Sequence, residues 1–216
     1  MKNPEQASVE AMLLKRDYQR LVELCQARKF AWKALHSKIY EGDEKLSWPA
    51  VEAIAMVMRQ WWEQGGEAKV REYIRRLFWA LNDESGGIGW NAPQTIAETI
   101  VLIPELLDPY GSMMIDRTID EKLLVQGGLW GMGRLGNRII NSVDFFQERI
   151  LSVFKGNDPQ KLGLAAWAMG EVGFEKALIH LTSLRGRTEP ARIYIEGEFY
   201  SKPVGQWAQE AAYRIQ

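Results

Sequence analysis

The sequence of 216 residues predicts an all-α fold, a right-handed α-solenoid of helical pairs with one small β-hairpin near the C-terminus. Three observations predict this fold. Residues 157–186 have the pattern of two short amphipathic helices in succession, which cannot bury their apolar faces without a stacked neighbour. A similar segment lies 37 residues upstream, a period typical of helical-pair repeats. Residues 191–202 alternate in polarity and turn at Glu196-Gly197, which indicates a hairpin.

The helical pair at 157–186 has clear start and stop signals. Asp158 provides an N-cap and Pro159 a first-turn proline, so a helix is expected from there to Gly173. A second helix is expected over 174–184, ending before Gly186. Alanines in the first helix favour the close approach of a neighbouring helix: Ala165, Ala166 and Ala168.

The upstream copy matches this pair position by position. Trp130, Met132, Gly133 and Gly136 fall opposite Trp167, Met169, Gly170 and Gly173. The segment LGLAAWAMGEVGFEKALIHLTSLRG resembles a HEAT-like repeat of the phycobilisome-lyase type, and VQGGLWGMGRLG resembles a diverged copy of it. The resemblance covers about residues 119–216. The hairpin ahead of the last helix resembles an insert carried there by a bacterial subgroup of HEAT-like proteins of unknown function. This resemblance implies a fold and carries over no catalytic residue.

The N-terminal part predicts two further helical pairs. Ser8 is expected to cap a helix over 9–27, followed by a helix over 29–40. Ser47, followed by Trp48 and Pro49, predicts the start of a helix that ends at the next glycine pair. A fourth helix is expected over 67–82.

A turn-rich break at 83–93 separates these helices from the rest. Helices are then expected from Asn91 to Pro104 and over 112–119, 121–135, 142–154 and 204–215. We expect one domain over 1–216, with diverged helical pairs over 1–86 and a repeat-like part over 87–216.

Composition limits the classes of function. The formal net charge of −1 provides no overall field for nucleic acid or an anionic membrane. One cysteine excludes an internal disulfide and a cysteine-cluster metal site, and two histidines argue against a di-iron HEAT-repeat hydroxylase. The polar N-terminus does not resemble a signal peptide, and no apolar run is long enough to span a membrane. We expect a cytoplasmic protein without a metal or other cofactor.

Residues 131–136, GMGRLG, match the dinucleotide fingerprint G-x-G-x-x-G. That fingerprint requires a strand before the glycines and a helix after them. The preceding residues have a helical pattern, and the repeat places Ala168 opposite Gly131. Glycines that allow close helix packing are therefore the favoured interpretation.

Nine tryptophans offer a second candidate feature. Trp130 and Trp167 occupy one repeat position, which favours core packing between repeats over a binding groove. Trp90 lies among glycines just before a helix start, which predicts an exposed ring.

Three function classes follow. A non-catalytic scaffold that holds a protein or peptide partner on the concave face of a short helical solenoid is preferred, because no catalytic constellation is recognised. A bilin-lyase-like or other cofactor-attachment factor rests on the resemblance alone. A HEAT-like DNA-binding protein of the alkylpurine glycosylase type would need a basic face that the balanced charge does not suggest.

The candidate partner-binding residues lie on the repeat helices and on the loop before them. Arg134 and Glu171 are matched by the period, so they are expected to lie within reach of each other, either as a simple ion pair or as part of a groove. The proposed groove residues are Trp90, Glu98, Trp130, Arg134 and Glu171, since Trp and Arg are enriched at binding hot spots.

Overall fold

The computed structural model describes residues 4–81 and 90–216. Residue contacts divide the chain into two compact units, Met1–Pro104 and Glu105–Gln216, each with its own core. The boundary expected between 86 and 87 lies outside the described residues. The helix that follows it, α6 (Ala92–Leu102), belongs to the first unit, although the sequence pattern grouped it with the repeats.

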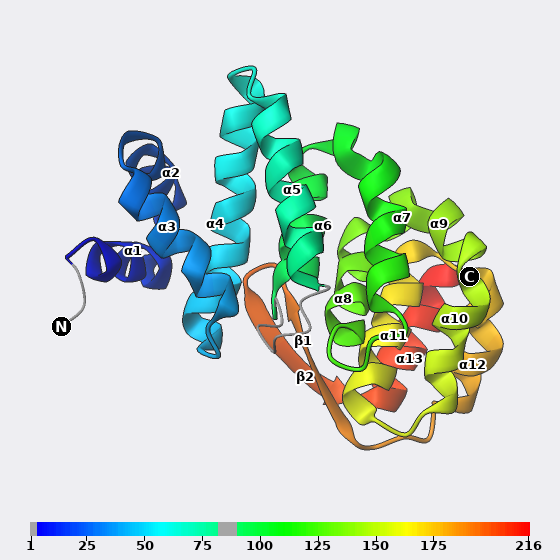
Figure 1. Ribbon diagram of the computed structural model, residues 1–216. Coiled ribbons are helices and arrows are strands. Elements are labelled where there is room, and N and C mark those ends of the chain that lie inside the picture. The colour runs from blue at the N-terminus through cyan, green and yellow to red at the C-terminus, as the bar shows by residue number, and fades with distance from the viewer. Residues whose placement is uncertain (1–3, 82–89) are drawn as a thin grey trace. The chain divides into compact units, whose positions relative to one another are not determined.

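The first unit consists of helices in its described part (Figure 1). In chain order they are α1 (Pro4–Lys15), α2 (Tyr18–Ala27), α3 (Lys29–Ser37) with a 3-10 turn η1 (Lys38–Tyr40), α4 (Glu44–Glu63), α5 (Glu67–Leu81) and α6.

The single helix expected over 9–27 is wrong, because the chain breaks between α1 and α2. Arg16 adopts a left-handed conformation with φ of 53°. The break brings Arg16 Nη1 to 3.1 Å from Glu52 Oε2 on α4, and the Tyr18 hydroxyl donates to the same carboxylate. Ser8 therefore lies inside α1 and does not cap a helix.

Helix α4 begins about one turn earlier than the sequence pattern suggested. The Asp43 side chain accepts a hydrogen bond of 3.0 Å from the Lys45 amide and caps the helix. Pro49 consequently lies inside the helix, where its ring removes one backbone donor. The predicted end is confirmed, since α4 ends at Glu63 and Gly65 has φ of 80°.

Helix α6 packs against α4 and α5, is buried from Ala92 to Ile100 and carries several polar residues there. The hydroxyls of Thr95 and Thr99 each donate to the backbone carbonyl four residues earlier, at 2.7 Å. Asn91 Nδ2 donates to the Ile39 carbonyl at 3.1 Å and ties the start of α6 to η1. These bonds satisfy the polar groups that burial would otherwise leave without partners.

The second unit contains the repeats and the hairpin. After a 3-10 turn (η2, Pro104–Leu106) its elements follow the order expected from the sequence, except that the single helix expected over 142–154 is broken at Phe146 into two. They are α7 (Leu107–Thr118), α8 (Val125–Leu135), η3 (Gly136–Ile139), α9 (Ile140–Phe145), α10 (Gln147–Ser152), η4 (Val153–Lys155), α11 (Pro159–Val172), η5 (Glu175–Ala177), α12 (Leu178–Ser183), β1 (Pro190–Ile195), β2 (Glu198–Pro203) and α13 (Val204–Ile215).

Helix α11 is the centre of this unit and packs against α8, α13 and β1. Asp158 caps it as predicted, accepting hydrogen bonds from the amides of Gln160 and Lys161. Gly173 ends it in the left-handed region with φ of 75°, and Gly136 ends α8 with φ of 61°. The two glycines that the 37-residue period places opposite each other thus both end a helix.

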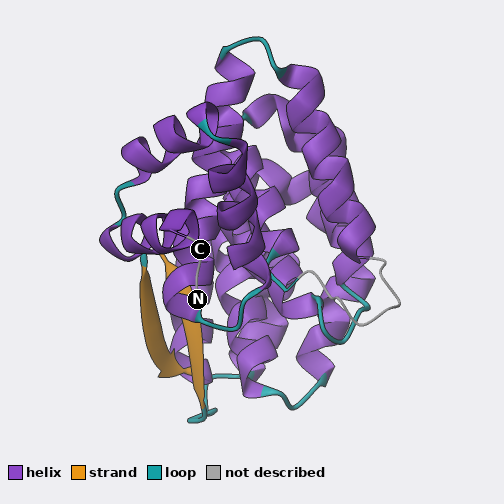
Figure 2. Ribbon diagram, turned by 60° about the vertical axis from the view of Figure 1, so that its left-hand side comes forward, coloured by secondary structure: helices purple, strands orange, loops and turns teal. Residues whose placement is uncertain are grey.

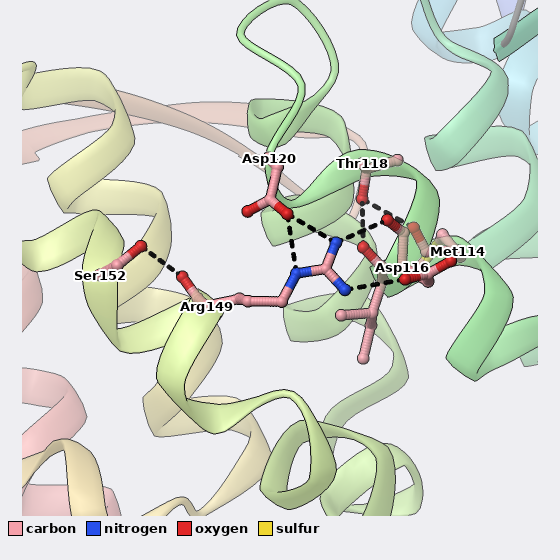
Figure 3. Close-up of polar contacts among 7 residues, drawn as sticks. Met114, Asp116, Thr118, Asp120, Arg149 and Ser152 are labelled. Carbon is pink, nitrogen blue, oxygen red and sulfur yellow. Dashed lines mark hydrogen bonds and ion pairs between the residues drawn. The ribbon is translucent and has the colours of Figure 1, made fainter.

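An arginine joins α10 to the end of α7 (Figure 3). Arg149 Nε lies 2.8 Å from Asp120 Oδ2, and its Nη1 lies 2.8 Å from Asp116 Oδ1. Its Nη2 also donates to the Asp116 backbone carbonyl at 3.0 Å. The planar guanidinium can make all these bonds at once, so it fixes α10 to the end of α7.

The predicted hairpin is confirmed. Strands β1 and β2 pair antiparallel, with Ile195 opposite Glu198 and a two-residue turn at Glu196-Gly197 (Figure 2). Both turn residues have positive φ, 48° and 93°, as a tight primed turn requires. The Gln160 side chain holds β1 on α11, donating to the Arg192 carbonyl and accepting from the Arg192 amide.

Candidate functional site

The residues that match G-x-G-x-x-G lie inside α8 and at its C-terminal end. Glycines in this position cannot bind a dinucleotide as the fingerprint does. Gly131 and Gly133 are inside the helix, and Gly136 ends it. The residues just before α8 form a turn, not a strand. The phosphate-binding arrangement needs a strand-to-helix turn at the first glycine. The glycines therefore have the helix-packing role that the sequence favoured.

Trp130 and Trp167 are buried in the second unit, with 4% and 6% of their surface exposed. Trp130 Nε1 donates to the Tyr194 carbonyl on β1 at 2.7 Å. Trp207 on α13 makes the corresponding bond to the Ala191 carbonyl at 3.0 Å. Trp130 thus joins the core to the hairpin, and its ring face is not a surface feature.

Two of the five predicted residues lie in the first unit. Trp90 is exposed over 56% of its surface, just before α6, as the glycine-rich context predicted. Glu98 lies in the middle of α6 and is buried. Gln94, one turn before Glu98, is also buried, and its Oε1 has no hydrogen-bond partner among the described residues.

The other three residues lie in the second unit. Trp130 and Arg134 are on α8, and Arg134 is half-buried. Glu171 near the end of α11 forms an ion pair with Arg214 of α13. The expected approach of Arg134 to Glu171 stays a prediction, as does a groove that would include Trp90.

Sequence reasoning missed a cluster of aromatic residues on α3, η1, α4 and α5, in which Tyr73 is buried and the other rings are partly exposed. The ring of Trp32 lies 4.9 Å from that of Trp61 and 5.2 Å from that of Tyr73, between centroids. His36 stacks on Trp32, and its Nδ1 lies 3.0 Å from the Tyr73 hydroxyl. We name this set the α3–α5 aromatic cluster: Trp32, His36, Tyr40, Trp61, Lys69 and Tyr73.

A signal for this cluster was present in the sequence. Trp32, His36 and Tyr40 are spaced four residues apart, which places them on one face of a helix. The partners from α4 and α5 could not be identified, because which side of a neighbouring helix faces α3 depends on tertiary packing.

Burial changes the ionisation of several members of the cluster. It lowers the pKa of His36 below its ordinary value and raises the pKa of Tyr40. Tyr73 is more strongly affected, with its pKa raised by burial and then by the nearby Tyr40. The Lys69 ammonium lies 3.1 Å from the centroid of the Trp61 ring, and partial burial lowers its pKa. Near neutral pH, Lys69 is therefore the charged member of the cluster.

Other candidate chemistry is limited in the described part of the chain. No three His, Cys, Asp or Glu side chains there gather closely enough to hold a metal ion. Cys25 is buried on α2, and burial raises its pKa to about 12, which makes the thiolate scarce. Within residues 4–81 and 90–216, none of the helices has both the length and the apolar character needed to cross a bilayer.

Comparison with solved structures identifies the fold. A designed armadillo repeat protein, YIII(Dq)4CqI, superimposes with a TM-score of 0.56 at 16% identity, over 100% of this chain and 96% of that one. The chain therefore has a helical-repeat fold like that of an armadillo repeat protein. At this identity the likeness concerns the fold alone.

Two further comparisons add context. An archaeal HEAT-like repeats protein from Thermococcus onnurineus NA1 aligns over 99% of this chain at 16% identity, with a TM-score of only 0.33. An uncharacterized protein of Archaeoglobus fulgidus is 28% identical over 143 residues, covering 62% of this chain and 70% of that protein. No family model matches the sequence. The likeness to the phycobilisome-lyase type of repeat stays an expectation from the sequence.

Proposed function

We propose that the protein is a cytoplasmic, non-catalytic scaffold that holds a protein or peptide partner on the exposed faces of its repeat helices. The observation that carries this proposal is the unequal burial of tryptophan. All three tryptophans of the second unit, Trp130, Trp167 and Trp207, are buried. In the first unit, Trp79 is 80% exposed and Trp90 is 56% exposed.

Exposed indole rings are costly in water and are the side chains most enriched at binding hot spots. Trp90 is the preferred contact in the first unit, since its exposed ring lies two residues before the buried helix α6. Glu98 on the same helix is proposed to support that contact from within the unit.

The second unit contributes its own proposed contact, formed by Arg134 and Glu171 on neighbouring repeat helices. The ion pair of Glu171 with Arg214 is partly solvent-exposed, and such pairs add little to stability. A partner can therefore compete for these charges at small cost to the fold. Trp130 supports Arg134 from the core, one helical turn away.

The test starts with affinity purification from native lysate and identification of the retained protein by mass spectrometry. Binding of that protein is then measured to Trp90→Ala and to Arg134→Ala, with melting temperatures recorded for both. Tyr213→Ala is the matched control, because it removes another strongly exposed aromatic side chain. We expect at least about a tenfold loss of affinity for Trp90→Ala.

Binding that survives both substitutions in folded protein would exclude these contacts. A coloured ligand that co-purifies would favour the cofactor-attachment alternative instead. A salt-dependent shift with duplex DNA would favour the DNA-binding alternative.

A further inference from the structure

The α3–α5 aromatic cluster has the properties of a second contact surface within the first unit. We infer that it binds an acidic linear peptide segment in which carboxylates alternate with apolar side chains. This inference rests on the proposed scaffold function and specifies the chemistry of one partner.

The cluster is held rigid before any partner arrives. Trp32 packs against Trp61 at 4.9 Å and edge-on against Tyr73 at 5.2 Å, so three helices fix one another's rings. The hydrogen bond of 3.0 Å between His36 Nδ1 and the Tyr73 hydroxyl fixes the histidine. Because the rings are already ordered, a partner loses little side-chain entropy when it binds them.

The rings also remain accessible. Trp32, His36, Tyr40 and Trp61 are each partly exposed to solvent. These partly exposed rings on α3, η1 and α4 give an apolar contact area that a peptide side chain can cover. This accounts for the apolar positions of the proposed segment.

The charge of the surface accounts for its acidic positions. Lys69 lies over the Trp61 ring, and Lys29 lies one turn before Trp32 on the same face of α3. Within the described residues neither lysine forms an ion pair. By contrast, Arg59, Arg75 and Arg76 nearby all form ion pairs with glutamates, Arg75 and Arg76 sharing one carboxylate. Two uncompensated cations beside exposed rings are complementary to a carboxylate-bearing segment.

A single-stranded nucleic acid could also combine ring stacking with cation contacts. The nearby carboxylates count against it, since Glu63, Glu67 and Glu72 lie on the same two helices as Trp61 and Lys69. A continuous phosphodiester backbone would meet these negative charges, whereas a peptide can place its carboxylates only at the lysines. The peptide is therefore the favoured occupant.

The experiment uses the full chain and four fluorescein-labelled probes, followed by fluorescence anisotropy. One is a dodecapeptide of Asp, Glu, Leu and Phe. Two matched peptides replace its acidic residues with Asn and Gln, or with Lys. The fourth is a twelve-nucleotide deoxythymidine oligomer. We expect saturable binding of the acidic peptide, weakened about tenfold or more when NaCl rises from about 50 to about 300 mM.

The deciding variant is Lys69→Glu, which reverses an exposed charge and should leave the fold intact. We expect at least about a tenfold loss of affinity for the acidic peptide. Lys45→Glu is the matched control, since it makes the same change near the other end of α4, about 24 Å from Trp61 along the helix. Trp32→Phe should weaken binding as well, and Trp79→Ala, outside the cluster, should not.

Equal binding of the acidic and basic peptides, or an unchanged affinity in Lys69→Glu, would overturn the inference. Binding of the oligonucleotide alone would replace the peptide with a nucleic acid. The scaffold proposal is tested separately. If a lysate protein binds in a way that depends on Trp90 while the acidic peptide fails to bind, only the inference about the aromatic cluster is overturned.

Discussion

Gly133 on α8 lies directly against the indole ring of Trp167 on α11. A Cβ atom added to Gly133 would lie 2.7 Å from Trp167 Cε3 and 2.8 Å from Cη2. Gly170, its counterpart one repeat later, faces Ala211 on α13 in the same manner, with a distance of 2.7 Å to Ala211 Cα. The repeated glycines thus let each repeat helix approach the next one closely.

Gly133→Ala should lower the free energy of unfolding by about 1–3 kcal/mol, the usual cost of overpacking. The new methyl group would push against a large buried ring that has no space to move. Urea denaturation followed by circular dichroism measures the change. Gly186→Ala is the control, because nothing lies within 4 Å of a Cβ there. Equal stability of the two variants would contradict the packing role of Gly133.

The repeat was predictable because the same residue types recur at the positions where the fold requires a helix end or a buried side chain. Gly136 and Gly173 end their helices with positive φ, and Met132 and Met169 are fully buried. The 37-residue period alone places the members of each pair opposite each other. The hairpin was predictable too, since Glu196-Gly197 is a turn sequence between alternating residues.

Element starts in the first unit were not predictable in the same way. The break at Arg16 depends on Glu52, which is distant in the chain and reaches Arg16 and Tyr18 only through tertiary packing. The early start of α4 depends on Asp43, which caps the helix. This cap was not identified from the sequence, because the Ser-Trp-Pro motif at 47–49 is a stronger helix-start signal. Local patterns specify helices well, but long-range partners decide where some of them begin.

Trp130→Phe should destabilise the protein by about 1–3 kcal/mol, because the buried Tyr194 carbonyl would lose its indole donor. The phenyl ring keeps most of the apolar contact, so the effect reports mainly on this bond. Hydrogen exchange should also become faster in the hairpin. Trp79→Phe, an exposed position on α5, should change neither quantity. Unchanged hairpin exchange in Trp130→Phe would show that the bond does not hold the strands.

Cys25 should react slowly with thiol reagents in the native protein. Its pKa of about 12 leaves roughly one thiolate in ten thousand at pH 8, against about a quarter for an ordinary cysteine. Reaction with Ellman's reagent should therefore be far slower in buffer than in guanidinium chloride. Fast native labelling would show that α2 opens readily or that the thiol is accessible.

The candidate site was less predictable than the fold. An exposed Trp90 was expected from its glycine-rich surroundings, and this is observed. Trp61 gave no such signal, since tryptophan near the end of an amphipathic helix is compatible with burial or exposure. Its half-exposed state follows from where α3 and α5 pack, as do its contacts with Trp32 and Lys69.

His36 should make the first unit less stable as the pH falls. Burial lowers the pKa of His36 in the folded protein, so the unfolded chain takes up a proton at a higher pH than the folded one. The stability that comes from the neutral form is present above the unfolded pKa of about 6.5 and is lost as the pH falls below it. One proton limits the slope to about 1.4 kcal/mol per pH unit.

His36→Asn removes this titration and keeps a polar group near the Tyr73 hydroxyl. The free energy of unfolding should fall between about pH 7.5 and 5.5 in the wild type and change less in His36→Asn. Tyr40 and Tyr73, which face the histidine, have raised pKa values and stay neutral over that range. His180→Asn is the control, since it removes the other histidine outside the cluster and should keep the wild-type slope. If His36→Asn loses stability with pH as steeply as the wild type, His36 is not the group responsible.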